Sequence, residues 1–145
     1  MSVSHILGVK GRSVITATSK ETVQSIAQKL SQNRIGAVVV VDDKGGIAGI
    51  VSERDIVRAV ANGRNCKDVV IKEVMTTNLI VSQSGDDLDY VMAVMIQNNI
   101  RHLPVVEESG LVGLLSMRDV VRVLVKNLKA ENHYLKDFIG GKFEA

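Results

Sequence analysis

The sequence predicts an α/β (mixed α+β) fold built from two similar halves, each with the element order β-α-β-β-α. The first reason is a repeat, because residues 49–58 and 113–122 are identical at six of ten positions at an offset of 64. Ordinary composition gives about one chance match in ten. The second reason is that apolar residues switch between β and helical spacing in the same order in both halves. The predicted units are residues 6–62 and 73–128, with a tail at 129–145.

Each half is expected to open with a short β run, at residues 13–17 and 79–82, followed by an amphipathic helix. Ser19 and Ser84 are the expected N-caps of these helices. The apolar positions fall at helical spacing in both halves: Val23, Ile26, Ala27 and Leu30, then Leu88, Val91, Met92 and Met95. We expect these two faces, at 23–30 and 88–95, to meet the same faces of a second copy in a homodimer.

A hairpin should come next in each half. Its strands are expected at 37–41 and 47–51 in the first half, and at 102–106 and 111–115 in the second. The unbroken valines at 38–41 indicate a strand that is covered on both faces. Pro104 lacks a backbone donor, so it favours an edge position for its strand.

A second helix is expected after Ser52 and after Ser116. Residues 117–139 contain no Gly or Pro and keep helical spacing, so the last helix should overshoot its unit and break at Gly140-Gly141. Its far end has two interpretations: it packs on a partner subunit, or it is a solvated tail.

The net charge, the cysteine count and the length of the apolar runs argue against several classes of function. The net charge of +2, from 18 basic and 16 acidic residues, is too balanced to indicate a nucleic-acid protein by bulk charge. The single Cys66 excludes an internal disulfide framework, and no metal site is expected. No apolar run approaches the ~20 residues of a membrane span, and residues 1–11 lack the apolar stretch of a secretory signal, so we expect a cytoplasmic protein with no membrane partner.

The repeated Ser-x-Arg-Asp segment carries the candidate chemistry. Ser52 and Asp55, like Ser116 and Asp119, fit a helix capping box that needs no ligand. A second interpretation is an anion site, because the free N–H groups at a helix N-terminus attract anions. Arg54 and Arg118 lie in the first helical turn, where a cation opposes the helix dipole but its planar fork suits a phosphate.

The doubled unit, with Gly-x-x-Ser-x-Arg-Asp before each last helix, resembles the cystathionine-β-synthase (CBS) domain pair, also called the Bateman module. The matching segments are residues 35–42, 49–55, 74–76, 100–106 and 113–119, and the likeness covers about residues 6–128. It implies tandem CBS domains related by a pseudo-two-fold with two clefts between the copies, in a disc-like homodimer with an unknown protein partner. A bound adenine nucleotide is implied, such as AMP, ADP, ATP or NAD(H), and no catalytic cofactor.

The resemblance also implies a site for each part of the nucleotide. Asp55 and Asp119 would hold the ribose, with Ser52 and Ser116 beside the sugar or phosphate. The segments before the hairpins would line the clefts, and there Arg101 and His102 could meet phosphate while Gly36 and Ala37 could not. The residues expected near the adenine are Thr16, Ala17, Ile35, Gly36, Ala37, Val81, Ser82 and Ile100.

We therefore expect Arg101, His102 and Arg118 to converge near Asp119, which would make the second-half cleft the stronger site. The function expected first is that of a regulatory module, not an enzyme, which senses the energy or redox state through an adenine nucleotide and signals to an unknown partner. Two other functions stay open. The protein could be an enzyme that uses a nucleotide, although no nucleophile–base pair is apparent. It could also bind nucleic acid through a basic line on the last helix, made of Arg118, Arg122, Lys126 and Lys129. Most such lines are solvated faces, which is the first interpretation of this one.

Overall fold

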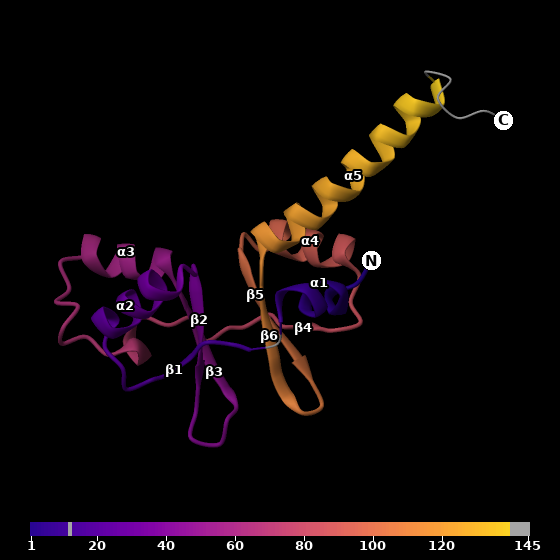
Figure 1. The fold of residues 1–145 in the computed structure, drawn as a ribbon. Helices are drawn as coiled ribbons and strands as arrows, with labels where there is room; N and C mark the ends of the chain where they lie inside the picture. Colours follow the sequence, from indigo (N-terminus) through magenta and orange to yellow (C-terminus); the bar gives the residue numbers. More distant parts are fainter. Residues whose placement is uncertain (12, 140–145) are drawn as a thin grey trace.

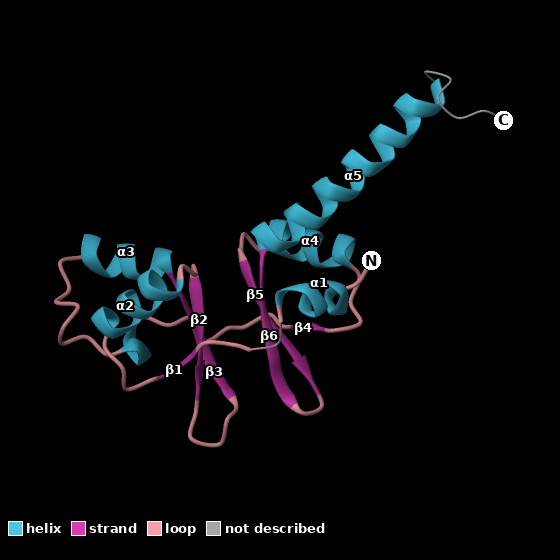
Figure 2. Ribbon diagram, in the orientation of Figure 1, coloured by secondary structure: helices cyan, strands magenta, loops and turns pink. Residues whose placement is uncertain are grey.

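The computed structural model describes residues 1–11 and 13–139, which form two sheets of three strands with helices packed against them. Figure 1 shows the sheets beside each other at the centre, with α2 and α3 outside one and α1 and α4 outside the other. The same layers are coloured by type in Figure 2. The predicted α/β class and the order β-α-β-β-α in each half are confirmed.

The first half contains β1 (Thr16–Thr18), α2 (Val23–Asn33), β2 (Ala37–Val41), β3 (Ile47–Ser52) and α3 (Glu53–Ala61). β2 is the central strand, parallel to β1 and antiparallel to β3. Residues 37–40 of β2 are buried, which confirms the strand covered on both faces. β1 is shorter than predicted and begins at Thr16, because only residues 16–18 pair with β2.

The second half repeats this order with β4 (Ser82–Gln83), α4 (Leu88–Gln97), β5 (His102–Glu107), β6 (Gly110–Ser116) and α5 (Met117–Ile139). The expected edge position of Pro104 is wrong, since β5 is the central strand of its sheet. The proline is tolerated because β4 is only two residues long and pairs with Val105 and Val106, beyond Pro104.

Two N-cap predictions are also wrong. The caps are Thr22, whose hydroxyl accepts a hydrogen bond from the Ser25 amide at 3.1 Å, and Asp87. Ser19 and Ser84 lie in the turns before the helices. In both halves the turn from the strand into the helix is three residues longer than predicted. The N-cap therefore lies three residues after the predicted serine.

The faces expected to meet a second copy instead form the cores of the molecule. Val23, Ile26 and Leu30 are buried against the first sheet, and Leu88, Val91 and Met95 against the second. Burial of one apolar stripe per helix is the ordinary way in which a helix is held on a sheet. These six side chains are therefore not available to a second copy, whereas Ala27 and Met92 of the predicted faces are half-buried.

Each core also receives a segment from outside its own half. Helix α1 (Val3–Lys10), which was not predicted, packs Val3, Ile6 and Leu7 into the second core. The 3-10 helix η1 (Ile71–Glu73), in the link between the halves, buries Ile71 in the first core. A Cβ on Gly113 would lie 2.5 Å from Leu7 Cδ2, so Leu7 would have to shift, and one on Gly49 would lie 2.9 Å from the Thr76 carbonyl oxygen, which favours glycine there. Helix α1 and the 3-10 helix η1 are therefore packed parts of the fold.

Helix α5 extends well beyond the body, as predicted (Figure 1). Val120 is buried, and Met117, Val123 and Leu124 pack against the second core. The remainder of the helix runs outward without a sheet beneath it. The expected break at Gly140-Gly141 lies outside the described residues.

Candidate functional site

A cleft of about 270 Å³ opens between the two halves at the N-terminus of α3. It brings together seven of the predicted site residues: Gly36, Ser52, Arg54, Asp55, Ile100, Arg101 and His102. Five further residues complete its lining: Ile50, Glu53, Arg58, Thr76 and Asn99. Both halves contribute, so the cleft exists only when the two are packed together.

The Ser52–Asp55 pair is a capping box at the start of α3. The Ser52 amide donates to Asp55 Oδ2 at 2.8 Å, and Arg58 Nη1 lies 3.6 Å from Asp55 Oδ1. The capping interpretation is therefore confirmed, and it does not exclude a binding role. Capping fixes the buried carboxylate at the wall of the cleft, next to the positive end of the helix.

The segments that begin the two hairpins, at Gly36 and at His102, lie against each other where the two halves meet. A Cβ on Gly36 would lie 3.1 Å from His102 Nε2, so glycine in the first half makes room for the imidazole of the second. Each segment is tied to the following helix, since the Glu53 amide donates to the Gly36 carbonyl at 3.0 Å and the Met117 amide to the Arg101 carbonyl at 2.7 Å. Arg101 and His102 are thereby held at the cleft of Asp55.

His102 is neutral at neutral pH in this setting. Burial lowers its pKa below the ordinary value, and the nearby positive charge of Lys10 lowers the pKa further. Glu53 and Asp119 act in the opposite direction, and the net shift remains downward. A negatively charged group placed beside the ring would favour the protonated form.

The second Ser-x-Arg-Asp motif caps α5 in the same way but has an additional partner. The Ser116 amide donates to Asp119 Oδ2 at 3.0 Å, and the Asp119 amide donates to Ser116 Oγ at 3.0 Å. Lys10, at the end of α1, donates to Asp119 Oδ2 at 2.7 Å and to the Leu114 carbonyl at 2.8 Å. Burial raises the pKa of Asp119, but these hydrogen bonds outweigh it and bring the pKa below its ordinary value.

The three residues expected around Asp119 do not form one group, although Asp119 lies close enough to His102 to act on its pKa. Arg101 and His102 line the cleft of Asp55, whereas Arg118 lies on the outer face of α5 beside Val121 and Arg122. The segment of Arg101 and His102 lies at both helix N-termini, because its backbone is bonded to the start of α5 and the packing of the two halves also brings its side chains to the start of α3.

The residues expected near the adenine are dispersed. Gly36 and Ile100 line the cleft of Asp55. Ala17 and Ala37 are buried in the first half, Ile35 packs against its core, and the Thr16 carbonyl accepts a hydrogen bond from Lys29. Val81 is exposed, while Ser82 is buried and bonds Asp86 through its hydroxyl. Their ligand contacts remain proposals.

Several lining residues were missed by sequence reasoning. Thr76 lies in the matched segment 74–76, and its backbone pairs with Ile50, so the family pattern could have pointed to it. Arg58 is one helical turn after Arg54, which is a usable signal. Lys10 meets Asp119 across 109 residues, and no local pattern indicates that contact.

The described part of the chain has no group of three or more metal-binding side chains. Among the same residues, no helix is long and apolar enough to cross a membrane.

Two β-α-β-β-α repeats that share a polar cleft define a tandem-repeat α/β module. A family model described as CBS domain matches residues 5–62 and 71–126. The chain therefore belongs to the CBS domain family and carries the domain twice.

Relatives and solved structures agree with this assignment. The chain is 31% identical to the mitochondrial CBS domain-containing protein CBSX3 of Arabidopsis thaliana, over 98% of this chain and 73% of that protein. It is 34% identical to protein MK0525 of Methanopyrus kandleri, over 79% of this chain, and spans 60% of that protein's length. A signal-transduction protein with CBS domains from Burkholderia ambifaria superposes with a TM-score of 0.83 at 34% identity, covering 87% of this chain and 95% of that one.

Two similar structures contain adenosine compounds. The CBS domain pair of protein MJ0100, in complex with 5'-methylthioadenosine and S-adenosyl-L-methionine, has a TM-score of 0.79 at 29% identity, over 88% of this chain and 98% of that one. The CBS domain protein PAE2072 from Pyrobaculum aerophilum, complexed with AMP, has a TM-score of 0.74 at 29% identity, over 82% and 89% of the two chains.

Proposed function

We propose that this protein is a regulatory module that binds an adenine nucleotide in the cleft of Asp55 and signals its level to a partner protein. The observation that carries the proposal is the composition of the cleft. Arg54, Arg58 and Arg101 meet the N-terminus of α3 there, beside the fixed carboxylate of Asp55. Cations and a helix N-terminus suit a phosphate, and a carboxylate suits the two hydroxyls of a ribose.

The cleft has a wall for each part of such a ligand. Ile50 and Ile100 offer apolar surface for the base, Asp55 an acceptor for the ribose, and the arginines donors for phosphate. Its volume of about 270 Å³ lies just below the range of about 300–1,000 Å³ typical of ligand pockets. That size favours a mononucleotide such as AMP over NAD(H).

The positive charge of the cleft also indicates which of the adenosine compounds in the similar structures would suit it best. Three arginines oppose the sulfonium of S-adenosylmethionine, and they find no phosphate on methylthioadenosine. AMP, the ligand of PAE2072, carries a phosphate for the arginines and a ribose for Asp55. We therefore rank AMP first, with ADP and ATP next, because additional phosphates could reach beyond the cleft.

A regulatory role, rather than catalysis, fits the chemistry of the cleft. Its titratable groups are the capping Asp55, the half-buried His102, Glu53 and the arginines. The Ser52 hydroxyl donates to Asp55 Oδ2 at 3.3 Å, but this contact belongs to the capping box, in which the same oxygen also accepts the Ser52 amide. A turnover assay with AMP, ATP and NADH tests this view, and a specific product would overturn it.

The binding proposal is tested with a matched pair of variants. Arg54 and Arg118 hold the same place in the two motifs, but only Arg54 lines the cleft. We expect Arg54→Ala to weaken AMP binding about 10- to 150-fold, from the loss of a charge-assisted hydrogen bond worth about 1.5–3 kcal/mol. Arg118→Ala should bind as wild type does. Equal affinities in a calorimetric titration would overturn the site. The mass and ultraviolet spectrum of any molecule released on denaturation would identify the natural ligand.

A further inference from the structure

The outward part of α5 carries a row of apolar side chains along one face. Val121, Val125, Leu128 and Leu135 are each between 41% and 63% exposed. Their spacing of four, three and seven residues is that of a seven-residue repeat, with Asn132 filling the position between Leu128 and Leu135. We call residues 121, 125, 128, 132 and 135 the α5 stripe.

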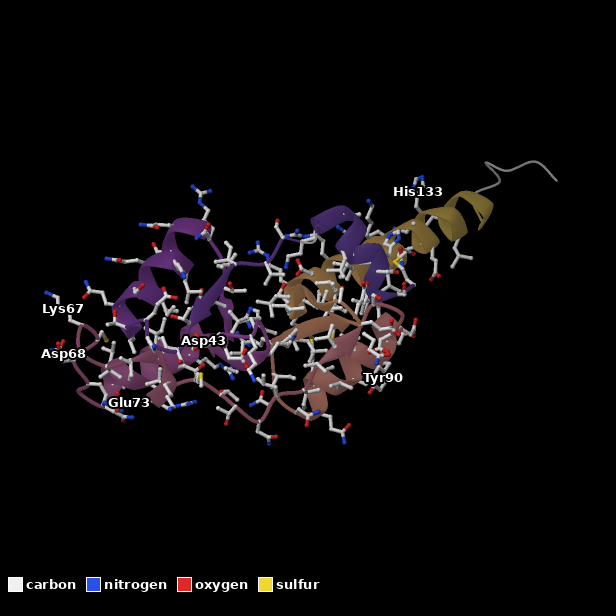
Figure 3. The ribbon with its side chains drawn as sticks, turned by 90° about the horizontal axis from the view of Figure 1, so that it is seen from below. Asp43, Lys67, Asp68, Glu73, Tyr90 and His133 are labelled. Carbon is white, nitrogen blue, oxygen red and sulfur yellow. The ribbon has the colours of Figure 1, made fainter. Side chains whose placement is uncertain are left out.

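The body of the molecule does not cover the stripe. The residues of α5 that pack on the second core are Met117, Val120, Val123 and Leu124, all near the start of the helix. Beyond them the helix leaves the body (Figure 1), and Figure 3 shows His133 on this outlying part. A helix with an unpartnered stripe at this spacing gains most by packing against a second helix.

The residue types at the stripe favour a parallel pair of helices. Val125 and Asn132 occupy the first apolar position of the repeat, and Val121, Leu128 and Leu135 occupy the fourth. A β-branched residue at the first position with leucine at the fourth favours two parallel strands. A single asparagine at the first position fixes both register and strand number, because it pairs with its own copy in the same layer.

The flanking charges distinguish a parallel from an antiparallel arrangement. Glu131 and Lys136 lie on opposite flanks of the stripe, five residues apart. In a parallel pair each Glu131 lies beside Lys136 of the second copy, whereas an antiparallel pair sets the flank of Arg122, Lys129 and Lys136 against itself. Arg118 precedes the stripe at a core position, so the helices diverge there toward the two bodies.

We propose that residues 121–135 of α5 pair with the same segment of a second copy of this chain as a short parallel coiled coil. Because the helices are parallel, the pairing sets the two bodies at the same end of the coiled coil. Because fifteen residues span only about 22 Å, the pair is short and its dimer should dissociate on dilution. The inference does not depend on which ligand the cleft binds.

Disulfide trapping tests the proposal in the full chain with Cys66→Ser as background. Leu128→Cys puts a thiol in the interface, where the same residue of a parallel partner lies within disulfide reach. Ala130→Cys puts one on the opposite face of the helix and is the control. We expect mild oxidation to cross-link the Leu128→Cys chain and not the Ala130→Cys chain. No cross-link at position 128, or equal cross-linking at both positions, would overturn the proposal.

Charge reversal gives a second measurement that leaves the stripe intact. Glu131→Lys should weaken the dimer about tenfold in sedimentation or light scattering, because each of two flanking pairs becomes repulsive. The double variant Glu131→Lys with Lys136→Glu should restore it. A monomeric wild type at tens of micromolar, or a double variant that stays as weak as the single one, contradicts the proposal. So does nucleic acid that binds the wild-type helix while the protein remains monomeric.

Discussion

Lys10 and Asp119 are 109 residues apart in the chain, and the ammonium of one lies 2.7 Å from the carboxylate of the other. Asp55, which holds the same place in the first repeat, has Arg58 of its own helix as its charged neighbour at 3.6 Å. Two aspartates with the same place in the repeat therefore differ in their partners. The first is available at an open cleft, and the second is held by the N-terminal helix.

This difference predicts unequal effects of removing the two carboxylates. Asp55→Ala should weaken AMP binding by about 10- to 150-fold, through loss of the ribose acceptor. Asp119→Ala should change the affinity by less than about threefold, because Lys10 already occupies that carboxylate. Calorimetric titration beside melting curves separates binding from stability. Both variants lose a capping bond, so both should melt earlier, and a larger affinity loss in Asp119→Ala would reverse our assignment.

Lys10→Met should lower the free energy of unfolding by an amount that depends on pH. The pKa of Asp119 is lowered in the folded protein, so its contribution to stability is present above the unfolded pKa of about 4 and is lost as pH falls through the folded pKa. Lys10 supplies part of that shift. We expect the variant to lose about 1 kcal/mol or less near pH 7, since the pair is partly exposed.

The loss caused by Lys10→Met should then diminish below about pH 4, as Asp119 becomes protonated in wild type as well. Urea unfolding at several pH values measures the difference. A loss that is constant with pH would show that Lys10 acts through packing and not through its charge.

Nucleotide affinity should rise as pH falls from about 8 to 7, a range in which the phosphate, with a second pKa of about 6, stays mostly doubly charged. The pKa of His102 is lowered in the unliganded protein, so the ring is neutral there. A phosphate beside the ring stabilises its charged form, so binding takes up a proton and becomes more favourable at lower pH. Titration calorimetry in buffers of different ionisation enthalpy counts the protons, and His102→Gln should abolish the dependence. A phosphate held away from His102 would leave wild type independent of pH.

Gly36→Ala should weaken binding more than it weakens the fold. The new Cβ would lie 3.1 Å from His102 Nε2, and relief of that contact moves the ring into the cleft. We expect a loss of affinity of about tenfold or less, with a loss of stability of about 1 kcal/mol or less. Gly8→Ala is the control, because a Cβ there meets nothing within 4 Å. In the middle of α1 it should stabilise the protein by about 0.5–1 kcal/mol and leave the affinity unchanged.

The sequence was sufficient for most of the fold because its signals are local. Helical spacing placed Val23, Ile26 and Leu30 on one face, and the run at 37–41 identified the central strand of the first sheet. The N-caps were misplaced because serine and threonine occur at several neighbouring positions, and only the geometry of the turn selects Thr22.

The site was predicted less well than the fold, because the chain contains the same motif twice. When two copies have the same pattern, the sequence does not say whether a segment faces the helix of its own copy or of the other. Arg101 and His102 were assigned to Asp119 on that ground, and the packing sets them at the cleft of Asp55. Lys10 lies before the first β run of the first copy, and only tertiary structure brings it to Asp119.

The exchange of segments between the two cores has a consequence for how the chain can be divided. Helix α1 precedes β1 of the first repeat but packs into the core of the second, while Ile71 lies in the link after α3 and packs into the core of the first. A fragment ending at residue 62 would contain Leu7 without the pocket it fills and would lack Ile71. Its complement would have an open core where α1 belongs. Neither piece is a self-sufficient folding unit, so the two copies should melt in a single cooperative transition and the severed pieces should recover their structure only when mixed.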